Sequence, residues 1–308
     1  MSSEPGRVEV SAALPAADRA SVLAVGDAAH RADGVAALDD QVRLDLEFGT
    51  GAAVRHLVVR AAGSDVVGGY GHLRPAATGG VGHLVVHPDH RRRGIATALV
   101  AALREEAAPG ALRLWAHGNL EPARRLADRL GFTAARELRQ MQRALDEPLD
   151  DPTYPADVSA QTFRPGVDDS AWVEANADAF ASHPEQGRLT VDDLHERMAQ
   201  PWFDPAGFFL AERGGRLLGF HWTKVHPAGE LGEAAVGEVY VVGVRPEAQG
   251  LGLGKALTLT GLHHLRACGL ATVTLYVEAD SPAATSLYAR LGFAVTNLDV
   301  EYRADPAR

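Results

Sequence analysis

The sequence predicts an α/β protein of two tandem domains, each an α+β arrangement in which a mixed sheet carries helices on both faces. The first observation is a repeated segment: residues 84–99 read LVVHPDHRRRGIATAL and residues 242–257 read VGVRPEAQGLGLGKAL. Each copy is an apolar strand, a turn with proline, a glycine-rich loop and an apolar-periodic helix. The repeat extends further, because Pro88 and Pro246 are 158 residues apart and the LGF strings at 130–132 and 291–293 are 161 apart. Loop amides and a helix dipole attract anions, so each copy predicts a pyrophosphate site.

Composition fits two globular domains and excludes several classes of function. The 308 residues are 46% hydrophobic and 23% charged, which suffices for two cores of ordinary size. The net charge of −10 argues against a nucleic-acid partner, which would need a dense basic face. No apolar run reaches the roughly 18 residues of a membrane helix, and the N-terminus lacks a signal-peptide pattern. We therefore expect a cytoplasmic monomer without a membrane partner, and the single cysteine, Cys268, excludes an internal disulfide.

The domain boundary is expected at residues 146–159. This segment, DEPLDDPTYPADVS, has three prolines and five acids without periodicity, which is typical of an extended surface linker. The sequence thus predicts an N-terminal domain over residues 1–145 and a C-terminal domain over residues 160–308.

The second half shows the fuller pattern of elements. We expect strands near 160–164, 207–213, 216–226, 236–245, 271–277 and 293–302, and helices near 168–181, 190–199, 252–268 and 282–291. Gly214 and Gly215 should form a hairpin turn, Ser281 should cap the last helix and Pro282 should take its first position. The first half repeats this order, with strands near 54–60, 66–73 and 80–87 and helices near 94–107 and 122–130.

The two loops resemble the acetyl-CoA loop of the GCN5-related N-acetyltransferases. Their pattern is Gln or Arg, two residues, Gly, one residue, then Gly or Ala. It occurs as Arg91-x-x-Gly94-x-Ala96 and as Gln249-x-x-Gly252-x-Gly254, each followed 30 to 40 residues later by an LGF string. One glycine-rich loop would be weak evidence, but two copies in the same context are specific. The resemblance implies two acetyltransferase domains with acetyl-CoA as cosubstrate.

Longer strings of the second half resemble the mycothiol synthase family, which consists of tandem acetyltransferases of actinobacteria. These strings are AFASHPEQG, GFHWTKVH, GEVYVVGVRPEAQGLGLGKALT and TLYVEADSPAATSLYARLGF. The resemblance covers nearly the whole chain and implies acetylation of the cysteinyl amine of cysteinyl-glucosaminyl-inositol, the last step of mycothiol synthesis. Two alternatives stay open: an N-acetyltransferase for another small amine or a protein N-terminus, and a regulatory acyl-CoA-binding module without turnover.

Acetyl transfer from a thioester to an amine needs a base, a donor for the carbonyl oxygen and an acid for the leaving thiolate. Glu238 begins the strand before the second loop and is the expected base, because an α-amine with a pKa of about 7.7 to 8.0 needs only a modest one. The resemblance places Tyr288 beside the sulfur, and a phenol with a pKa near 10 could act as the acid. By the repeat offsets Gly80 and Ala127 occupy the matching positions. The first domain is therefore expected to bind acetyl-CoA without catalysis, or else to keep the fold only as a structural partner.

The resemblance also implies the cofactor contacts. In the first half they are Leu84, Val85, Val86, Arg92, Arg93, Gly94, Ile95, Ala96 and Thr97. In the second half the amides of Val242, Gly243 and Val244 should bind the thioester carbonyl, and the pyrophosphate should lie on Gln249, Gly250, Leu251, Gly252, Leu253, Gly254 and Lys255. The start of the last helix should add Ser281, Pro282, Ala283, Ala284, Thr285 and Ser286, although many acetyltransferases have Asn where this chain has Ser281.

The expected acceptor is a small amino-sugar thiol, which needs carboxylates and directed donors at the mouth of the site. The resemblance implies Asp40, Glu185, Lys224 and Tyr276 for this role, together with Glu238. Each could instead be an ordinary solvated group. His83, His87, His90 and His117 show no spacing typical of metal ligands, so we expect no metal site.

Overall fold

The computed structural model describes residues 6–48, 54–61, 63–76, 79–107, 109–181 and 186–305. Its contacts divide the chain into two compact units: unit 1 is Met1–Leu138 with Asn297–Arg308, and unit 2 is Arg139–Thr296. The units depart from sequence order, because the chain passes between them within β6 (Thr133–Ala144) and within β12 (Ala294–Ala304). The expected domains 1–145 and 160–308 instead assign all of β6 to the first domain and all of β12 to the second. No helix in the described residues is long and apolar enough to cross a membrane.

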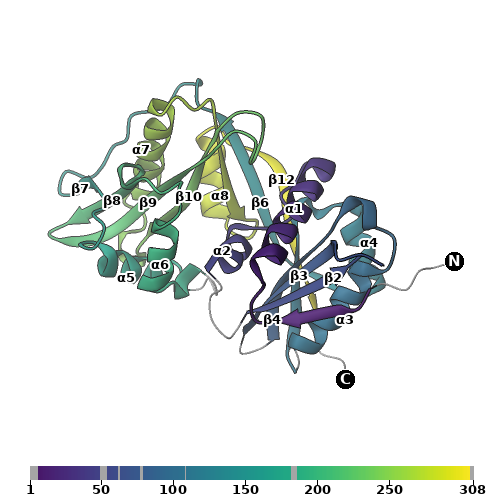
Figure 1. Cartoon of the computed structure of the whole chain (residues 1–308). Coiled ribbons are helices and arrows are strands. Elements are labelled where there is room, and N and C mark those ends of the chain that lie inside the picture. The colour runs from purple at the N-terminus through teal and green to yellow at the C-terminus, as the bar shows by residue number, and fades with distance from the viewer. Residues whose placement is uncertain are drawn as a thin grey trace. The chain divides into compact units, whose positions relative to one another are not determined.

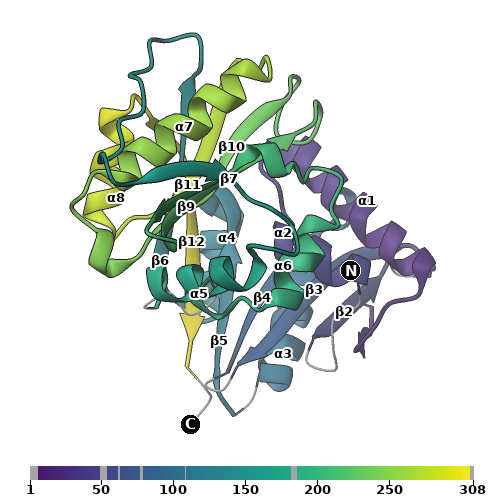
Figure 2. The same ribbon diagram turned by 90° about the vertical axis from the view of Figure 1, so that its left-hand side faces the viewer.

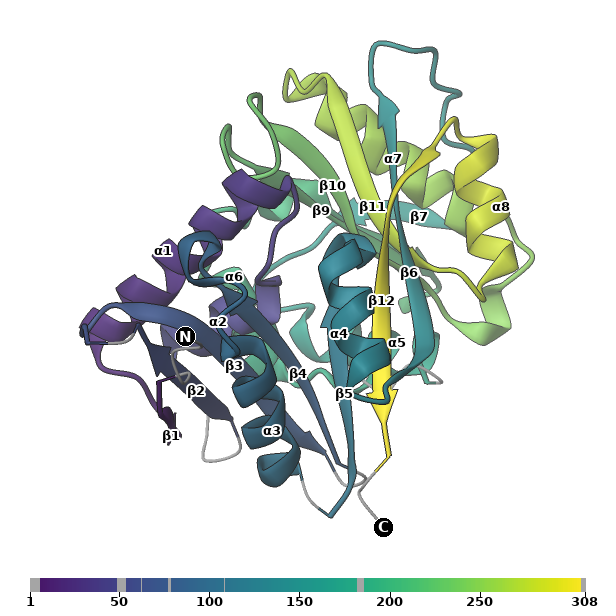
Figure 3. The ribbon, with the colours of Figure 1, turned by 90° about the vertical axis from the view of Figure 1, so that its right-hand side faces the viewer.

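Unit 1 is a mixed sheet with helices on both faces. Its strand order is β1 (Val8–Ser11), β2 (Arg55–Arg60), β3 (Val67–Ala76), β4 (Gly79–Val86), β5 (Ala111–Ala116) and β12, and only β4 and β5 run parallel. Alternate residues of the strands pack on opposite sides. One core joins the sheet to α3 (Ile95–Ala107) and α4 (Glu121–Arg129), and another joins it to α1 (Ala16–Asp33) and α2 (Asp40–Phe48) (Figure 3).

Unit 2 has the same plan. Its strand order is the second half of β6, then β11 (Thr272–Glu278), β10 (Val236–Val244), β9 (Arg216–His226), β8 (Phe208–Arg213) and β7 (Ser159–Thr162). Strands β10 and β11 are parallel, and β7 to β10 are antiparallel neighbours. Helices α5 (Asp169–Ala179) and α6 (Val191–Met198) pack on an aromatic core, whereas α7 (Leu253–Ala267) and α8 (Pro282–Arg290) pack on an aliphatic one (Figure 1). Figure 2 shows the outer end of this sheet, with β7 at its edge.

The predicted elements of both halves are confirmed to within about three residues at each end. The hairpin between β8 and β9 turns at Gly214 and Gly215, whose φ angles of 57° and 79° suit a two-residue turn of the primed type. Helix α8 begins at Pro282 as expected, but the Ser281 side chain makes no capping hydrogen bond. The sequence analysis predicted neither β5 nor β6.

The expected linker is tied to unit 2. Residues 146–158 carry no helix or strand, as predicted. They lie along α7, because the Tyr154 hydroxyl is 2.7 Å from Thr260 Oγ1 and His263 Nε2 is 2.9 Å from the Asp150 carbonyl oxygen. This segment therefore follows the helix that begins at the second glycine-rich loop.

Removal of residues 297–308 should destabilise unit 1. Residues Val300–Ala304 pair with Leu112–Ala116 of β5, and Ala304 is buried in the core beside α3. Without this segment β5 loses one partner strand. We expect the melting temperature of the unit 1 transition to fall by at least about 10 °C, since a few kcal/mol correspond to such a shift in a unit of this size. The measurement is calorimetry combined with amide hydrogen exchange of β5.

The matched control is a chain that ends at Asp305. It keeps every paired residue of β12 and should melt like the full chain. Unchanged exchange protection of β5 in the shorter chain would contradict the role assigned to this strand segment.

Candidate active site

Both glycine-rich loops have the same backbone shape. Arg92 and Gly94 in unit 1 have φ angles of 64° and 83°, and Gly250 and Gly252, 158 positions later, have 82° and 79°. No heavy atom among the described residues lies within 4 Å of where a Cβ would stand on Gly250 or Gly252. The face of the second loop is therefore open. Because the first amides of a helix have no partner within it, the start of α7 offers an anion-binding surface.

In each unit the sheet opens beside the loop. In unit 2 the parallel pairing joins Gly237–Val239 to Val273–Leu275 and stops there, although β10 continues to Val244. In unit 1 the pairing of β4 with β5 likewise stops at Gly82 and Leu114. Among the described residues, the last residues of β10 and β4 therefore present one backbone edge to no neighbouring strand. Successive amides of a strand point to opposite edges, and the Arg245 amide donates to Leu218 of β9, so the amides of Val242 and Val244 lie on this open edge whereas that of Gly243 faces β9.

A cavity of about 540 Å³ occupies the opened sheet of unit 1. Its walls are the ends of β4 and β5, the loop, the start of α3 and the length of α4. The residues predicted to contact cofactor in this half line it, except Arg93: Leu84, Val85, Val86, Arg92, Gly94, Ile95, Ala96 and Thr97. Arg125 and Arg129 add positive charge to the same wall. The cavity thus combines an apolar slot with cations suited to phosphates.

The predicted base, Glu238, is held on one face of the sheet of unit 2. It is buried and pairs directly across the antiparallel ladder with Lys224 of β9, so the two side chains lie on the same face. His226, two residues after Lys224, shares that face because side chains alternate along a strand. Its Nε2 donates a hydrogen bond of 2.5 Å to Glu238 Oε2, and its Nδ1 donates one of 2.8 Å to Glu230 Oε1. Glu238 Oε1 takes no part in these bonds.

His226 is an imidazolium in this arrangement. Both of its ring nitrogens donate, which only the protonated ring can do. Burial alone would lower the pKa of His226, but the hydrogen bonds to Glu230 and Glu238 outweigh it and raise the pKa to about 9. A cation therefore fixes the position of the predicted base.

Lys224 lies in an aromatic cage. It is buried, and its Nζ is 4.9 Å from the ring centre of Trp202 and 5.6 Å from that of Tyr240. Tyr240 follows Glu238 at strand spacing and so faces the same side, and it is the extra residue of a bulge between Val239 and Val241. Such cation–π contacts hold an ammonium where it is partly removed from water.

Tyr288 lies on α8 in the aliphatic core of unit 2. The side chain is buried beside Phe293, with 5.8 Å between ring centres, and burial raises the pKa of its phenol to about 12. Nearby on α8, the Thr285 hydroxyl is buried without a hydrogen-bond partner among the described residues. A buried hydroxyl in that state suits a polar ligand group at the start of α8.

The remaining predicted site residues lie on separate segments of the chain. Tyr276 lies on β11 and is 40% exposed, and Asp40 is the partly exposed first residue of α2 in unit 1. Glu185 lies outside the described residues. Lys255, predicted to hold the pyrophosphate, forms an ion pair of 2.9 Å with Asp150 in the structure. Since that pair is exposed, it contributes little stability and can give way to a ligand.

Sequence reasoning missed His226, Trp202 and Tyr240. His226 could have been found, because it follows Lys224 at strand spacing in WTKVH and so must face the same side. Tyr240 could have been found in the same way, because it follows Glu238 at the same spacing. Trp202 lies in a loop and carried no signal.

The loops, the opened sheets and the buried carboxylate define an acetyl-CoA-dependent N-acetyltransferase. The acetyltransferase (GNAT) family model matches residues 172–293, and an acetyltransferase (GNAT) domain model matches residues 53–134. A mycothiol acetyltransferase of Parafrankia sp. (strain EAN1pec) is 52% identical over 96% of this chain and 97% of its own length. A mycothiol acetyltransferase of Thermomonospora curvata is 52% identical over 92% of this chain and 93% of its own length. The chain therefore belongs to the mycothiol acetyltransferase family.

Solved structures share the fold. A tandem GNAT protein from the clavulanic acid biosynthesis pathway has a TM-score of 0.74 at 23% identity and covers 98% of this chain and 99% of its own. A GCN5-related N-acetyltransferase from Sphaerobacter thermophilus has a TM-score of 0.69 at 24% identity and covers 98% and 97%. The predicted fold of two tandem acetyltransferase domains is thus confirmed.

Replacement of His226 by Gln should change how stability depends on pH. The pKa of His226 is raised from 6.5 to about 9 on folding, so its contribution is complete below pH 6.5 and is lost as pH rises through 9. We expect the free energy of unfolding of the parent to decline over this window by about 2–3 kcal/mol more than that of the variant. Urea unfolding at pH 6 and pH 9.5 measures it. A parallel pH dependence in the two proteins would show that His226 is not protonated in the native state.

Proposed function

We propose that the chain transfers the acetyl group of acetyl-CoA to the cysteinyl amine of cysteinyl-glucosaminyl-inositol, which gives mycothiol and CoA. The observation that carries the proposal is Glu238, which lies on the strand that opens toward the second phosphate loop and contacts Lys224 and His226 of the neighbouring strand β9. Its support is the family, whose members are about half identical to this chain over nearly the whole length. The chemistry belongs to unit 2 in this proposal.

Glu238 would act as the base. The cysteinyl amine must lose a proton before or as it attacks the thioester carbonyl, and an α-amine needs only a modest base at neutral pH. His226 would occupy Glu238 Oε2 and place an opposite charge beside the buried side chain, which leaves Oε1 for the amine proton. His226 is thus a positioning residue for the base.

Tyr288 would act as a hydrogen-bond donor to the sulfur rather than as a full proton donor. Burial raises the pKa of its phenol to about 12, well above that of a thiol at about 8.5. Complete transfer of the proton to the thiolate would therefore be unfavourable. A hydrogen bond still stabilises the negative charge that develops on the leaving sulfur.

Backbone groups would supply the rest of the cofactor site. The amides of Val242 and Val244 lie on the edge of β10 where no strand among the described residues pairs, so they can donate to the thioester oxygen as it gains charge. The loop from Gln249 to Lys255 and the start of α7 would hold the pyrophosphate. Ser281–Ser286 would contact the cofactor at the start of α8. The buried Thr285 hydroxyl there has no hydrogen-bond partner among the described residues.

Acceptor recognition would use residues that differ in character. Lys224 in its aromatic cage would present one fixed donor, and Tyr276 an exposed phenol. Asp40 and Glu185 are retained as acceptor residues from the sequence resemblance alone. An acceptor with many hydroxyls suits such a mixture of donors and carboxylates.

Unit 1 would bind acetyl-CoA without turning it over. The support is a cavity of about 540 Å³ lined by its phosphate loop. At the position that matches Glu238 it has Val81, which pairs with Arg74 of β3 as Glu238 pairs with Lys224 of β9. The repeat offset had predicted Gly80 there, but the bulge in β10 shifts the match by one residue. This unit keeps the binding features and lacks the base.

Replacement of Glu238 by Gln should abolish most turnover and spare cofactor binding. We expect the rate to fall by roughly 10² to 10⁴, the range for a positioned acid–base group, with the acetyl-CoA Kd within about threefold. Tyr288→Phe should cost less, because a thiolate is already a fair leaving group. Release of CoA is followed with cysteinyl-glucosaminyl-inositol and, in parallel, with a panel of other amines and a peptide with a free N-terminus.

The panel separates the proposals. A preference for another amine would replace the acceptor but keep the enzyme class. An absence of turnover with every amine would favour a binding module that only holds acyl-CoA. Near-normal turnover of the Glu238→Gln enzyme would remove this residue from the mechanism.

Replacement of Gly94 or Gly252 by Leu should separate the roles of the two units. Both glycines have positive φ and head a helix at the phosphate loop, so a side chain there denies the close approach of a phosphate. The Gly252 variant should lose activity, whereas the Gly94 variant should keep turnover to within about tenfold. Calorimetric titration should find two acetyl-CoA sites in the parent and one in each variant. An inactive Gly94 variant beside an active Gly252 variant would move catalysis to unit 1.

A further inference from the structure

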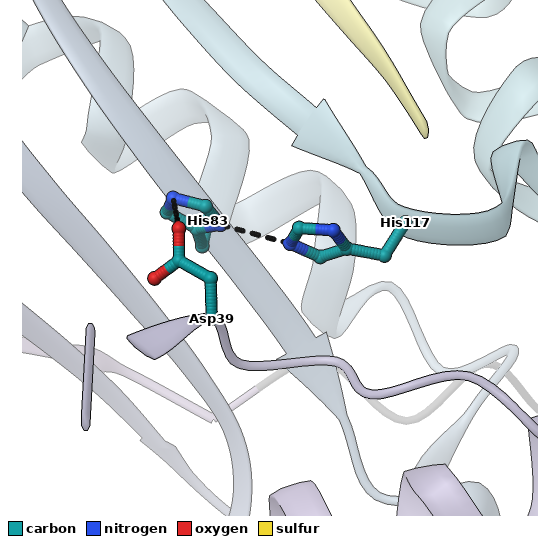
Figure 4. A group of neighbouring side chains, drawn as sticks. All are labelled: Asp39, His83 and His117. Atoms are coloured by element: carbon teal, nitrogen blue, oxygen red, sulfur yellow. Dashed lines mark hydrogen bonds and ion pairs between the residues drawn. The ribbon is translucent and has the colours of Figure 1, made fainter. Parts of the chain in front are cut away.

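We propose that Asp39, His83 and His117 of unit 1 form a binding site for one divalent transition-metal ion, with Zn²⁺ as its natural probe. Figure 4 shows the three side chains, which come from the segment before α2, from β4 and from the end of β5. Each offers one ligand atom, and these atoms all lie within 4.8 Å of one another. This inference replaces the expectation of a chain without a metal site.

The distances suit an ion held by two imidazoles. His83 Nδ1 and His117 Nε2 are 3.3 Å apart. Two nitrogens bound to a tetrahedral Zn²⁺ at about 2.0–2.1 Å are separated by roughly the same distance. Asp39 Oδ2 lies within 4.8 Å of the ligand atoms of both histidines but is 3.2 Å from His83 Nε2, so its carboxylate must leave that nitrogen to become the third ligand.

The surroundings already orient the ligands. His117 Nδ1 donates a hydrogen bond of 2.9 Å to Asp299 Oδ2, and Asp299 Oδ1 accepts one of 2.7 Å from the Gly118 amide. A carboxylate behind the second nitrogen is the usual partner of a metal-bound histidine. Asp39 is fixed as well, since its Oδ1 accepts a hydrogen bond of 2.8 Å from the Val42 amide. Both the ligand set and its outer partners are therefore present.

The donor atoms indicate the class of ion. Two nitrogens and one carboxylate favour Zn²⁺, Co²⁺ or Ni²⁺ over Ca²⁺ and Mg²⁺, which prefer oxygen ligands alone. His117 also lines the cavity of about 540 Å³, which provides an entry path and room for water as a further ligand. Without an ion, the same contacts form a hydrogen-bonded chain from Asp39 to Asp299. The experiment must distinguish the ion from this chain.

The test is calorimetric titration of ZnCl₂ into the full chain after chelator treatment, in a Cys268→Ser background. This background is needed because Cys268 Sγ lies 3.7 Å from His264 Nε2 in unit 2, and that exposed pair could bind Zn²⁺ as well. We expect one ion per chain with a Kd below about 10 μM. His83→Gln and His117→Gln should weaken binding at least about 100-fold, and Asp299→Asn by about 10–100-fold.

The matched control is the double variant His87→Gln, His90→Gln. These two rings are also close, 5.4 Å between centres, and lie in the same unit. Binding that persists in His117→Gln, or that disappears in the control, would overturn the proposal. So would the absence of any Zn²⁺ uptake by the Cys268→Ser protein.

A second measurement needs no substitution at the site. X-ray absorption of the Zn²⁺-loaded Cys268→Ser chain should show outer-shell scattering from two imidazoles and a shell of nitrogen and oxygen only. Scattering from fewer than two imidazoles would refute the site even if the histidine variants failed to fold. Because the readout is binding, the outcome is independent of the acetyltransferase assay.

Discussion

The parallel pairing that ends halfway along one strand is the feature on which the rest of the site depends. Between β10 and β11 it stops at Val239, and between β4 and β5 it stops at Gly82. A sheet paired to its end would use every backbone amide in its ladder and leave no slot between strands. Since the pairing stops, the strand end offers alternate amides on that edge, and the glycine-rich loop follows it directly. On the same strand Tyr240, two residues after Glu238, has its ring centre 5.6 Å from Lys224 Nζ, beside the base.

The two units use this opening differently, and the difference rests on a few positions. In unit 2 the strand before the loop carries Glu238, and α8 carries Tyr288. In unit 1 the matching positions are Val81, which pairs with Arg74 as Glu238 pairs with Lys224, and Ala127, which lines the cavity. A small residue in place of the phenol enlarges the space for a ligand and removes a donor. The same substitutions that remove the chemistry thus preserve a binding cavity, which fits a retained cofactor better than a decayed domain.

Much of this could be predicted from the sequence, because turns, glycines and apolar periodicity are local signals. The hairpin at Gly214, the start of α8 at Pro282 and both phosphate loops follow from residue types alone. Strand β6 could not be predicted in this way: TAARELRQMQRA consists mainly of helix formers and becomes a strand only through its neighbours. Pairing between distant segments likewise decides three other features. These are the division of β12 between the two units, the bulge at Tyr240 and the approach of His83 to His117.

Each unit also contains a histidine fixed by carboxylates, and the two cases show how burial decides what an imidazole does. His226 lies between Glu230 and Glu238, and the two acids outweigh the cost of burial, so the ring is a cation that neutralises the base. In unit 1 two rings share the acids: His117 is held by Asp299, and burial lowers the pKa of His83 to about 4, which leaves it neutral with an unprotonated nitrogen. In His226 both ring nitrogens carry a proton, whereas in neutral His83 one ring nitrogen keeps its lone pair. A buried lone pair facing a second imidazole is what a metal ion requires, whereas the cationic His226 can only hold an anion.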